Sequence, residues 1–170
     1  MLPGMFSQGQ TPTLAFWQKV RREEILHLFQ REVYGFTPAV PPTLTYRVLE
    51  REQVEDSVIK ERIALTVALG GKQASFEILV YTPADKSRKL PAVIMLNPFS
   101  RNPALDHARR DREHLPYQDI TAQGYAAVYA LVDGLAWDDK DRYHTGIFEL
   151  FPRENAHSWG VISAWAWAGS

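Results

Sequence analysis

The residues that could do chemistry stand where two apolar runs of the sequence end. Residues 91–96 form a run that stops at Asn97, and residues 124–132 form a second run that stops at Asp133. A carboxylate just after a buried strand faces the edge at which open α/β sheets bind ligands, so Asp133 is a candidate for a substrate pocket. Capping of the following loop is the simpler role for Asp133, and the sequence favours it.

A long aromatic connection follows Asp133. Residues 137–151 contain Trp137, Tyr143 and Phe148, and long connections often line binding sites. Rings at these positions could stack on the face of a sugar, which makes all three residues candidates for the substrate pocket. Packing of the rings beneath the connection explains them equally well.

The sequence offers no thiol chemistry and no metal site. It contains no cysteine, which excludes disulfides, thiolate zinc sites and cysteine nucleophiles. The segment from Asp139 to Tyr143 departs from the EF-hand calcium loop at its third ligand. His107 and His114 are too far apart for a shared face of one helical turn. No metal is therefore expected.

The composition is that of an ordinary globular protein. Of 170 residues, 45% are hydrophobic and 23% are charged, and 19 basic against 20 acidic residues leave a net charge of -1. A chain without a basic excess has no field that gathers phosphates, so no nucleic-acid partner is expected. No stretch approaches the ~18 apolar residues of a membrane span, so no membrane partner is expected. No export signal is visible, and a cytoplasmic location is the default expectation.

The first element expected is an amphipathic helix over about 12–34. Thr11 and Pro12 supply an N-cap and a first helical residue, and Gly35 supplies a stop. The apolar residues share one broad face, which predicts that this face packs against a larger body and that its aromatic rings belong to a core. These residues are Leu14, Trp17, Ile25, Leu28, Phe29 and Val33.

The strands expected next are of two kinds. Residues 46–58 and the alternating segments on both sides of Gly70 predict three strands, the last two joined as an antiparallel hairpin. The apolar runs 91–96 and 124–132 predict parallel strands buried on both faces, with a crossover helix over 117–123 between them. The expected fold class is therefore α/β, with a hairpin that leads into parallel strands and flanking helices.

A tryptophan-rich helix is expected over about 158–168, with Ser158 as its N-cap. The segment is apolar nearly all round, so it must be buried nearly all round. Buried parallel strands also need neighbours on both edges. Residues 1–170 are therefore expected to form a single partial domain, with strands over about 46–132, whose fold is incomplete and whose uncovered apolar surface favours self-association.

Most of the chain from about Trp17 onward resembles the bacterial glucuronoyl esterases, a carbohydrate-esterase family that includes proteins labelled acetyl xylan esterases. The resemblance is carried by 22–25, 33–35 (Val-Tyr-Gly), 96–99 (Leu-Asn-Pro-Phe), 138–142, 150–153 (Leu-Phe-Pro-Arg) and 159–167 (Trp-Gly-x-Ile-x-Ala-Trp-Ala-Trp). It implies the amino-terminal part of an α/β-hydrolase fold. It also implies an enzyme that cleaves the ester between glucuronic acid on xylan and a lignin alcohol by a Ser-His-acid mechanism, without a metal or organic cofactor. Members of the family are often exported.

The nucleophilic serine of this family lies in a Gly-x-Ser-Arg-x-Gly-Lys turn between a strand and a helix. The 170 residues contain no such turn, so no catalytic residue is expected in this chain, and the chain alone is expected to be inactive. Ser170 follows a glycine but has no strand before it, and it is not expected to be the nucleophile.

The resemblance also gives the loop after residue 96 a role. In α/β hydrolases this loop commonly supplies one backbone N–H to the oxyanion hole, which makes Asn97, Phe99 and Ser100 candidates. Pro98 has no N–H, so the donor must be a neighbour such as Phe99 or Ser100. A simple strand-ending turn is the alternative.

Two other functions stay open on the sequence. One is a truncated, non-catalytic remnant that binds a partner through its uncovered core. The other is an acetyl xylan esterase or a different acyl hydrolase on the same scaffold. The partner expected for the complete enzyme is a carbohydrate ester.

Overall fold

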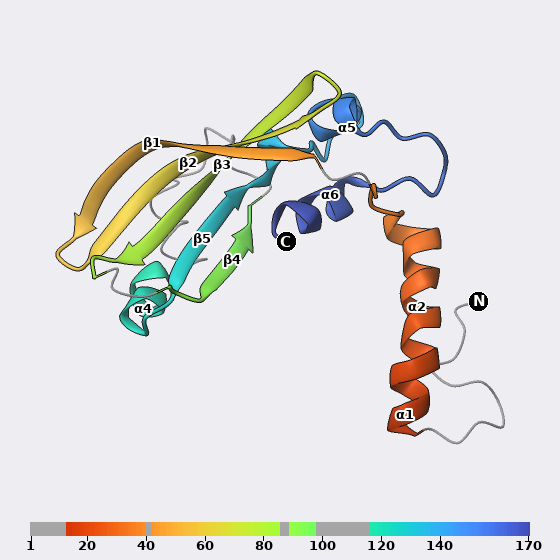
Figure 1. The fold of residues 1–170 in the computed structure, drawn as a ribbon, viewed down its shortest axis with the longest axis horizontal. Coiled ribbons are helices and arrows are strands. Elements are labelled where there is room, and N and C mark those ends of the chain that lie inside the picture. The colour runs from red at the N-terminus through yellow and green to blue at the C-terminus, as the bar shows by residue number, and fades with distance from the viewer. Residues whose placement is uncertain (1–12, 40–41, 86–88, 98–115) are drawn as a thin grey trace.

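The sheet is the centre of the fold. The computed structural model describes residues 13–39, 42–85, 89–97 and 116–170. Within these ranges the strands form one mixed sheet of five strands in the order β1-β2-β3-β5-β4 (Figure 1). The strands are β1 (Thr43–Glu55), β2 (Val58–Leu69), β3 (Lys72–Pro83), β4 (Ala92–Leu96) and β5 (Ala126–Leu131). The neighbours from β1 to β5 pair antiparallel, and β5 pairs parallel with β4.

The predicted hairpin is confirmed. β2 and β3 pair antiparallel from Leu69 and Lys72 outward, and the turn between them consists of Gly70 and Gly71. Both glycines have positive φ angles, +59° and +80°, which is the backbone that a two-residue hairpin turn requires and that other residues rarely adopt. β1 begins at Thr43, three residues earlier than predicted.

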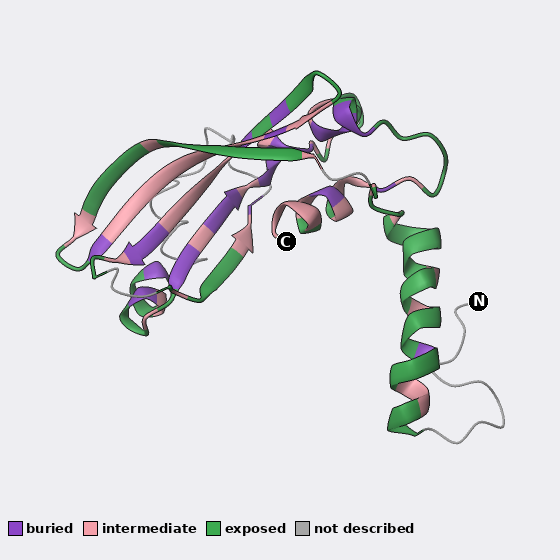
Figure 2. Ribbon diagram, in the orientation of Figure 1, coloured by how far each residue is buried: buried purple, intermediate pink, exposed green. Residues whose placement is uncertain are grey.

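The predicted parallel pair is also confirmed. β4 and β5 align Ala92 with Ala126 and Leu96 with Ala130, and α4 (Tyr117–Ala122) precedes β5 where the crossover helix is expected. β5 is well buried, but Val93 and Ile94 of β4 are 43% and 48% exposed. The prediction that both strands are buried on both faces is therefore wrong for β4, because β4 is an edge strand of this sheet (Figure 2).

The main core lies between the sheet and the segments that follow β5. These segments are η3 (Val132–Gly134), α5 (Ile147–Leu150) and α6 (Val161–Ala168). Trp159 is only 1% exposed, and the rings of Phe148, Phe151 and Trp167 surround it in edge-to-face contacts with centroid separations of 5.8, 5.8 and 5.9 Å. Buried aromatic rings contribute strongly to stability, so Trp159 anchors this half of the fold.

The tryptophan-rich helix begins later than predicted and is less buried. α6 starts at Val161, and the hydroxyl of Ser158 accepts hydrogen bonds from the backbone of Glu154 and Asn155 instead of capping the helix. Ala164 is its one buried residue among those described, and Ile162 is 61% exposed. The prediction of burial on nearly all sides is wrong for this chain, because α6 has the sheet on one side, and on the other side only the segment around Tyr34 reaches it among the described residues.

The amino-terminal helix forms an arm that projects from the body of the fold (Figure 1). It runs continuously through α1 (Leu14–Phe16), two π-helical turns, η1 (Trp17–Arg21) and η2 (Gln30–Tyr34), and α2 (Arg22–Phe29) between them. The hydroxyl of Thr13 caps it by accepting a hydrogen bond from the Phe16 N–H, 3.1 Å away. The predicted cap at Thr11 and Pro12 lies outside the described residues. The predicted stop at Gly35 is confirmed.

The apolar face of the arm is largely uncovered. Leu14 is 70% exposed, Phe29 is 42% exposed and Val33 is 62% exposed, and Figure 2 shows most of the arm as exposed. The prediction that this face packs and that its aromatic rings belong to a core is therefore wrong within this chain. No described element lies alongside the arm to receive that face.

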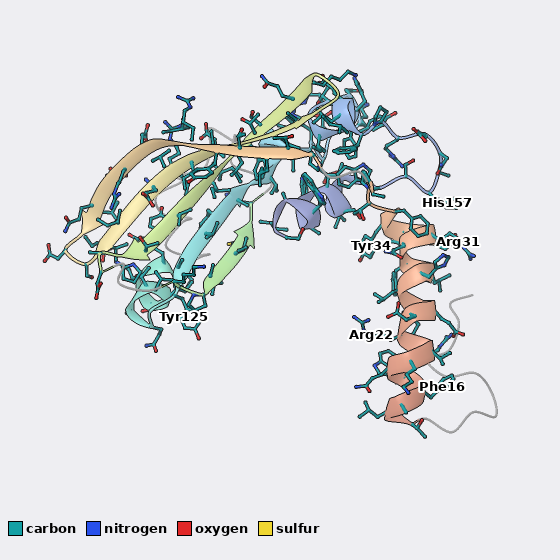
Figure 3. The ribbon with its side chains drawn as sticks, viewed as in Figure 1. Phe16, Arg22, Arg31, Tyr34, Tyr125 and His157 are labelled. Carbon is teal, nitrogen blue, oxygen red and sulfur yellow. The ribbon has the colours of Figure 1, made fainter. Side chains whose placement is uncertain are left out.

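The arm is attached to the body at its carboxyl end. The Tyr34 carbonyl accepts hydrogen bonds from the Gly160 N–H (2.9 Å) and the Ser163 hydroxyl (2.8 Å). The His157 ring donates through Nδ1 to the Arg31 carbonyl at 2.8 Å. Figure 3 shows Arg31, Tyr34 and His157 together at this junction. These donors satisfy carbonyls that a helix end leaves unpaired, so the attachment is a cap supplied from far along the chain.

None of the described helices combines the length and the apolarity that a bilayer crossing requires.

Candidate functional site

Asn97 and Asp133 lie at the same edge of the sheet. They follow the carboxyl ends of the neighbouring parallel strands β4 and β5, and both are buried, at 6% and 3% exposure. The Asn97 N–H donates to the Ala130 carbonyl (2.8 Å), and the Asn97 carbonyl accepts from the Val132 N–H (3.2 Å). The backbone hydrogen bonding between β4 and β5 thus continues one residue past both strands. It brings Asn97 and Asp133, both predicted from the sequence, to the edge where such sheets bind ligands.

The Asn97 backbone cannot serve as an oxyanion donor in this arrangement, because its N–H is already used by the Ala130 carbonyl. Of the three candidates in this loop, Phe99 and Ser100 lie outside the described residues and stay predictions. Asn97 instead helps to fix the place at which the loop leaves the sheet.

Asp133 lines a hollow of about 370 Å³ beside the start of β3. The polar groups around this hollow are mostly paired with one another. The Glu77 carboxylate accepts from Arg62 at 3.2 Å, and the Ser75 and Thr66 hydroxyls lie 2.9 Å apart. A hydrogen bond from the Arg62 guanidinium to Glu50, together with the charges of both glutamates, raises the pKa of Arg62. This cross-strand network stabilises the sheet surface next to Asp133.

Trp137 is engaged within its own loop. The Arg142 guanidinium lies over its ring, 3.6 Å from the centroid, in a cation–π contact. The Asp139 carboxylate holds Arg142 there through contacts of 3.1 and 3.3 Å, and it also accepts from the Asp141 N–H at 2.8 Å. These interactions, the Asp141 N–H foremost, lower the pKa of Asp139. One face of Trp137 is therefore occupied and cannot stack on a sugar.

Tyr143 and Phe148 line a second hollow of about 490 Å³, with His144, Pro152, Arg153, Glu154, Asn155 and Ala156 as the other lining residues. Phe148 is 3% exposed and forms part of the core, whereas Tyr143 is 45% exposed. The hollow borders α5, which is tied to the sheet by a hydrogen bond from Lys72 to the Glu149 carbonyl at 3.1 Å. The structure thus brings Tyr143 and Phe148 together but places Asp133 in a different hollow.

Sequence reasoning missed the polar side of this second hollow. Arg153, Glu154 and Asn155 stand just before the tryptophan-rich segment, where no periodic pattern marks them. Two signals were available: Arg153 belongs to the segment 150–153 of the resemblance, and all three residues lie in the connection between two core aromatic residues, Phe151 and Trp159. Among the described residues, no three His, Asp or Glu side chains gather closely enough to hold a metal ion.

No protein-family model matches the sequence, and no curated protein matches it significantly. Solved structures do match. A glucuronoyl esterase from Solibacter usitatus matches with a TM-score of 0.80 and 23% identity, over 99% of this chain and 51% of that chain. A CE15 glucuronoyl esterase from Teredinibacter turnerae matches with a TM-score of 0.73 and 22% identity, over 98% of this chain and 44% of that one. A promiscuous CE15 esterase from a marine bacterial metagenome matches with a TM-score of 0.69 and 18% identity, over 99% of this chain and 51% of that chain.

This chain therefore spans about half the length of the solved structures it matches. The expected fold class is confirmed: a mixed sheet with flanking helices, arranged as in part of an α/β hydrolase. The 170 residues are similar in fold to the matched half of a glucuronoyl esterase.

Proposed function

We propose that this chain is the amino-terminal part of a carboxylic ester hydrolase that cleaves glucuronate esters of xylan, with its nucleophile outside the 170 residues. The observation that carries the proposal is the match of nearly the whole chain to about half of a glucuronoyl esterase. A serine attacks the ester carbonyl in this mechanism, a histidine takes its proton, and a buried acid orients the histidine.

The groups that this chain contributes to the reaction lie at the edge of the sheet beyond the carboxyl ends of β4 and β5. The loop after Asn97 supplies a backbone N–H, from Phe99 or Ser100, to the oxyanion that forms on the ester carbonyl. Asp133 shapes the neighbouring edge of the pocket, and the loop from Trp137 to Phe148 forms its rim. The chain therefore contributes the framework and one oxyanion donor, while the proton-transfer groups come from elsewhere.

The edge of β4 supports this division. One side of β5 is taken by β3, so a further strand added to the parallel pair must lie beside β4. Val93 and Ile94 are half-exposed there. α6 ends close by, since a Cβ added at Gly169 would lie 3.3 Å from the Leu96 side chain. A strand that follows α6 is thus well placed to cover β4 and to carry the nucleophile at its carboxyl end.

Two measurements test the proposal. Reading the DNA beyond the codon for Ser170 should reveal an in-frame Gly-x-Ser-Arg-x-Gly-Lys segment, and an immediate stop codon would contradict the esterase. The purified 170-residue chain should not hydrolyse a glucuronate methyl ester, and turnover that is lost on mutating one of its own residues would contradict the placement of the nucleophile. If the longer protein cleaved acetylated xylan but not glucuronate esters, an acetyl esterase on the same scaffold would replace the proposed one.

A second candidate is a non-catalytic polypeptide that self-associates. The observation that favours it is the apolar surface left open on α6 and β4, where Ile162 is 61% exposed and Ile94 is 48% exposed. Large exposed apolar residues of this kind are typical of interaction sites. Size-exclusion chromatography with light scattering decides the point, because a dimer that Ile162→Lys dissociates supports this candidate and a compact monomer contradicts it.

A further inference from the structure

The outer edge of β1 is a long strand edge that no described strand covers. β1 has β2 on one side only, and most of its 13 residues are exposed (Figure 1). The backbone N–H and C=O groups along such an edge are a template on which another strand can pair. The proposed function adds a strand at the opposite edge, beside β4, and therefore leaves the edge of β1 open.

The first half of β1 presents an apolar face to solvent. Leu44, Tyr46 and Val48 are 63%, 75% and 45% exposed, and they share one face because side chains alternate along a strand. Thr43 and Thr45, between and before them, are also residues that favour strands. An exposed strand edge with an apolar face of this kind favours pairing with a further strand.

Arg47, on the other face of this segment, has no partner within its own chain. Across the β1–β2 pair it lies opposite Ala64, and no ion pair or side-chain hydrogen bond involves it among the described residues. The other charged side chains of β1 all have one: Glu50 with Arg62, Arg51 with Glu61, Glu52 with Lys60 and Glu55 with Tyr117. One positive charge on the open edge is thus left for a carboxylate from outside.

A β-bulge decides which residues of β1 lie one position either side of Val48. Val48 pairs with Ile63 and Glu50 pairs with Arg62, so Leu49 is an extra residue, and Val48 and Glu50 take consecutive positions in the pairing. Arg47 and Glu50 therefore lie one position before and one position after Val48, on the same face of the sheet. The edge carries a guanidinium and a carboxylate placed symmetrically about Val48, which makes it complementary to itself.

We propose that a second copy of this chain pairs with β1 antiparallel, about a two-fold axis at Val48. This register places Arg47 of each copy opposite Glu50 of the other, and directly opposed charges of unlike sign stabilise a strand pair. On the other face it places the exposed ring of Tyr46 opposite Arg51 of the second copy. The two five-stranded sheets become one continuous sheet, and because both copies use the same surface, the assembly closes at a dimer.

Glu50 can take part in this contact without leaving Arg62. Its side chain is 61% exposed, and a carboxylate has about four lone-pair sites, of which the hydrogen bond from Arg62 uses one. Arg47 of the second copy can therefore donate to the same carboxylate. The contact adds a donor to a group that is already held in place, which lowers the loss of conformational freedom on association.

Sedimentation velocity over a concentration series tests the proposal on the 170-residue chain. The wild type should form a dimer. Arg47→Glu brings carboxylates together at both contacts and Glu50→Arg brings guanidinium groups together, so each variant alone should raise the dissociation constant on the order of tenfold or more. An equimolar mixture of the two variants should dimerise again, because each contact then joins a Glu to an Arg.

Arg22→Glu is the matched control. It changes the net charge by the same amount as Arg47→Glu, at a side chain that is 54% exposed on the arm, away from the sheet (Figure 3). This variant should dimerise as the wild type does. Circular dichroism shows whether each variant is folded, and Val48→Lys, which sets two ammonium groups at the two-fold axis, is a second test that should also weaken the dimer if Glu50→Arg does not fold.

Four results would overturn the inference. They are a chain that stays monomeric at every concentration, a mixture of the folded variants that associates no more tightly than either alone, an equal loss in Arg22→Glu, and a dimer that Arg47→Glu leaves intact. If Ile162→Lys dissociates that last dimer, the contact lies on α6 instead. None of these measurements depends on ester hydrolysis, so the failure of this proposal leaves the proposed esterase untouched.

Discussion

Gly35 lies against the backbone of Trp159 so closely that no side chain fits between them. A Cβ on Gly35 would be 2.4 Å from the Trp159 Cα and 2.3 Å from the Ser158 carbonyl oxygen, and the φ angle of Gly35 is +78°. The end of the helical arm and the start of the tryptophan-rich segment are therefore joined at a point that only glycine permits.

We expect Gly35→Ala to lower the free energy of unfolding by more than about 3 kcal/mol, because it adds a steric clash to the roughly 1–2 kcal/mol cost of a positive φ. Urea denaturation followed by tryptophan fluorescence measures this. Gly71→Ala is the matched control, since Gly71 has a φ of +80° but open space around it. Gly71→Ala should lower the free energy of unfolding only by the cost of a positive φ. An equal decrease in the two variants would contradict the close approach at Gly35.

Trp159→Ala should be among the most destabilising single substitutions in the chain. Its ring is 1% exposed and touches three other aromatic rings, so truncation leaves a cavity and should cost about 3–5 kcal/mol. The comparison is Trp137→Ala, in which the ring is only half-buried and stacks against Arg142. Differential scanning calorimetry should show a much smaller shift for Trp137→Ala, and a reversed order would contradict the assignment of the core.

Acid should remove the stabilising contribution of Asp139. Because the Asp141 N–H and Arg142 lower its pKa in the folded protein, the ionised carboxylate is favoured by folding. Its contribution is present above the ordinary value of 3.8 and is lost as pH falls through the lower folded value. The stability difference between the wild type and Asp139→Asn should therefore shrink from pH 6 toward acid. A difference that stays constant with pH would contradict this carboxylate–Arg142 pairing.

Ile162→Lys should weaken self-association of the chain through α6. The residue is 61% exposed on the uncovered side of α6, and burying a charge in an apolar contact should raise the dimer dissociation constant on the order of tenfold or more. Sedimentation velocity over a concentration series gives this constant. Leu14→Lys, at a 70% exposed position on the far end of the arm, is the control, and an equal effect there would place the contact elsewhere.

Local signals in the sequence predicted the elements that local chemistry decides. The Gly70–Gly71 turn fixes the hairpin through its positive φ angles, and the apolar runs before Asn97 and Asp133 are the two parallel strands. Burial was predicted less well. The exposure of Ile94 in β4 depends on what lies at the sheet edge, and that of Phe29 depends on what lies beside the arm. Neither neighbour can be identified from the pattern of the segment itself.

Part of the candidate site could likewise be predicted from the sequence, and part could not. Asn97 and Asp133 come together because adjacent parallel strands end at one edge, a rule that follows from the strand direction alone. Tyr143 and Asn155 meet across an irregular connection whose course is set by individual contacts, such as the hydrogen bonds to the Ser158 hydroxyl. No periodicity encodes such contacts, so the polar side of the second hollow could not be predicted.

The strand order has a consequence for synthesis on the ribosome. β4 is made before β5, yet β5 lies between β4 and the meander of β1, β2 and β3. The meander can assemble by itself as it emerges, but β4 has no sheet to join until the polypeptide has been extended through Leu131. During that interval an apolar strand leaves the exit tunnel without its partner, so residues 92–96 stay open to capture by nascent-chain chaperones until β5 is made.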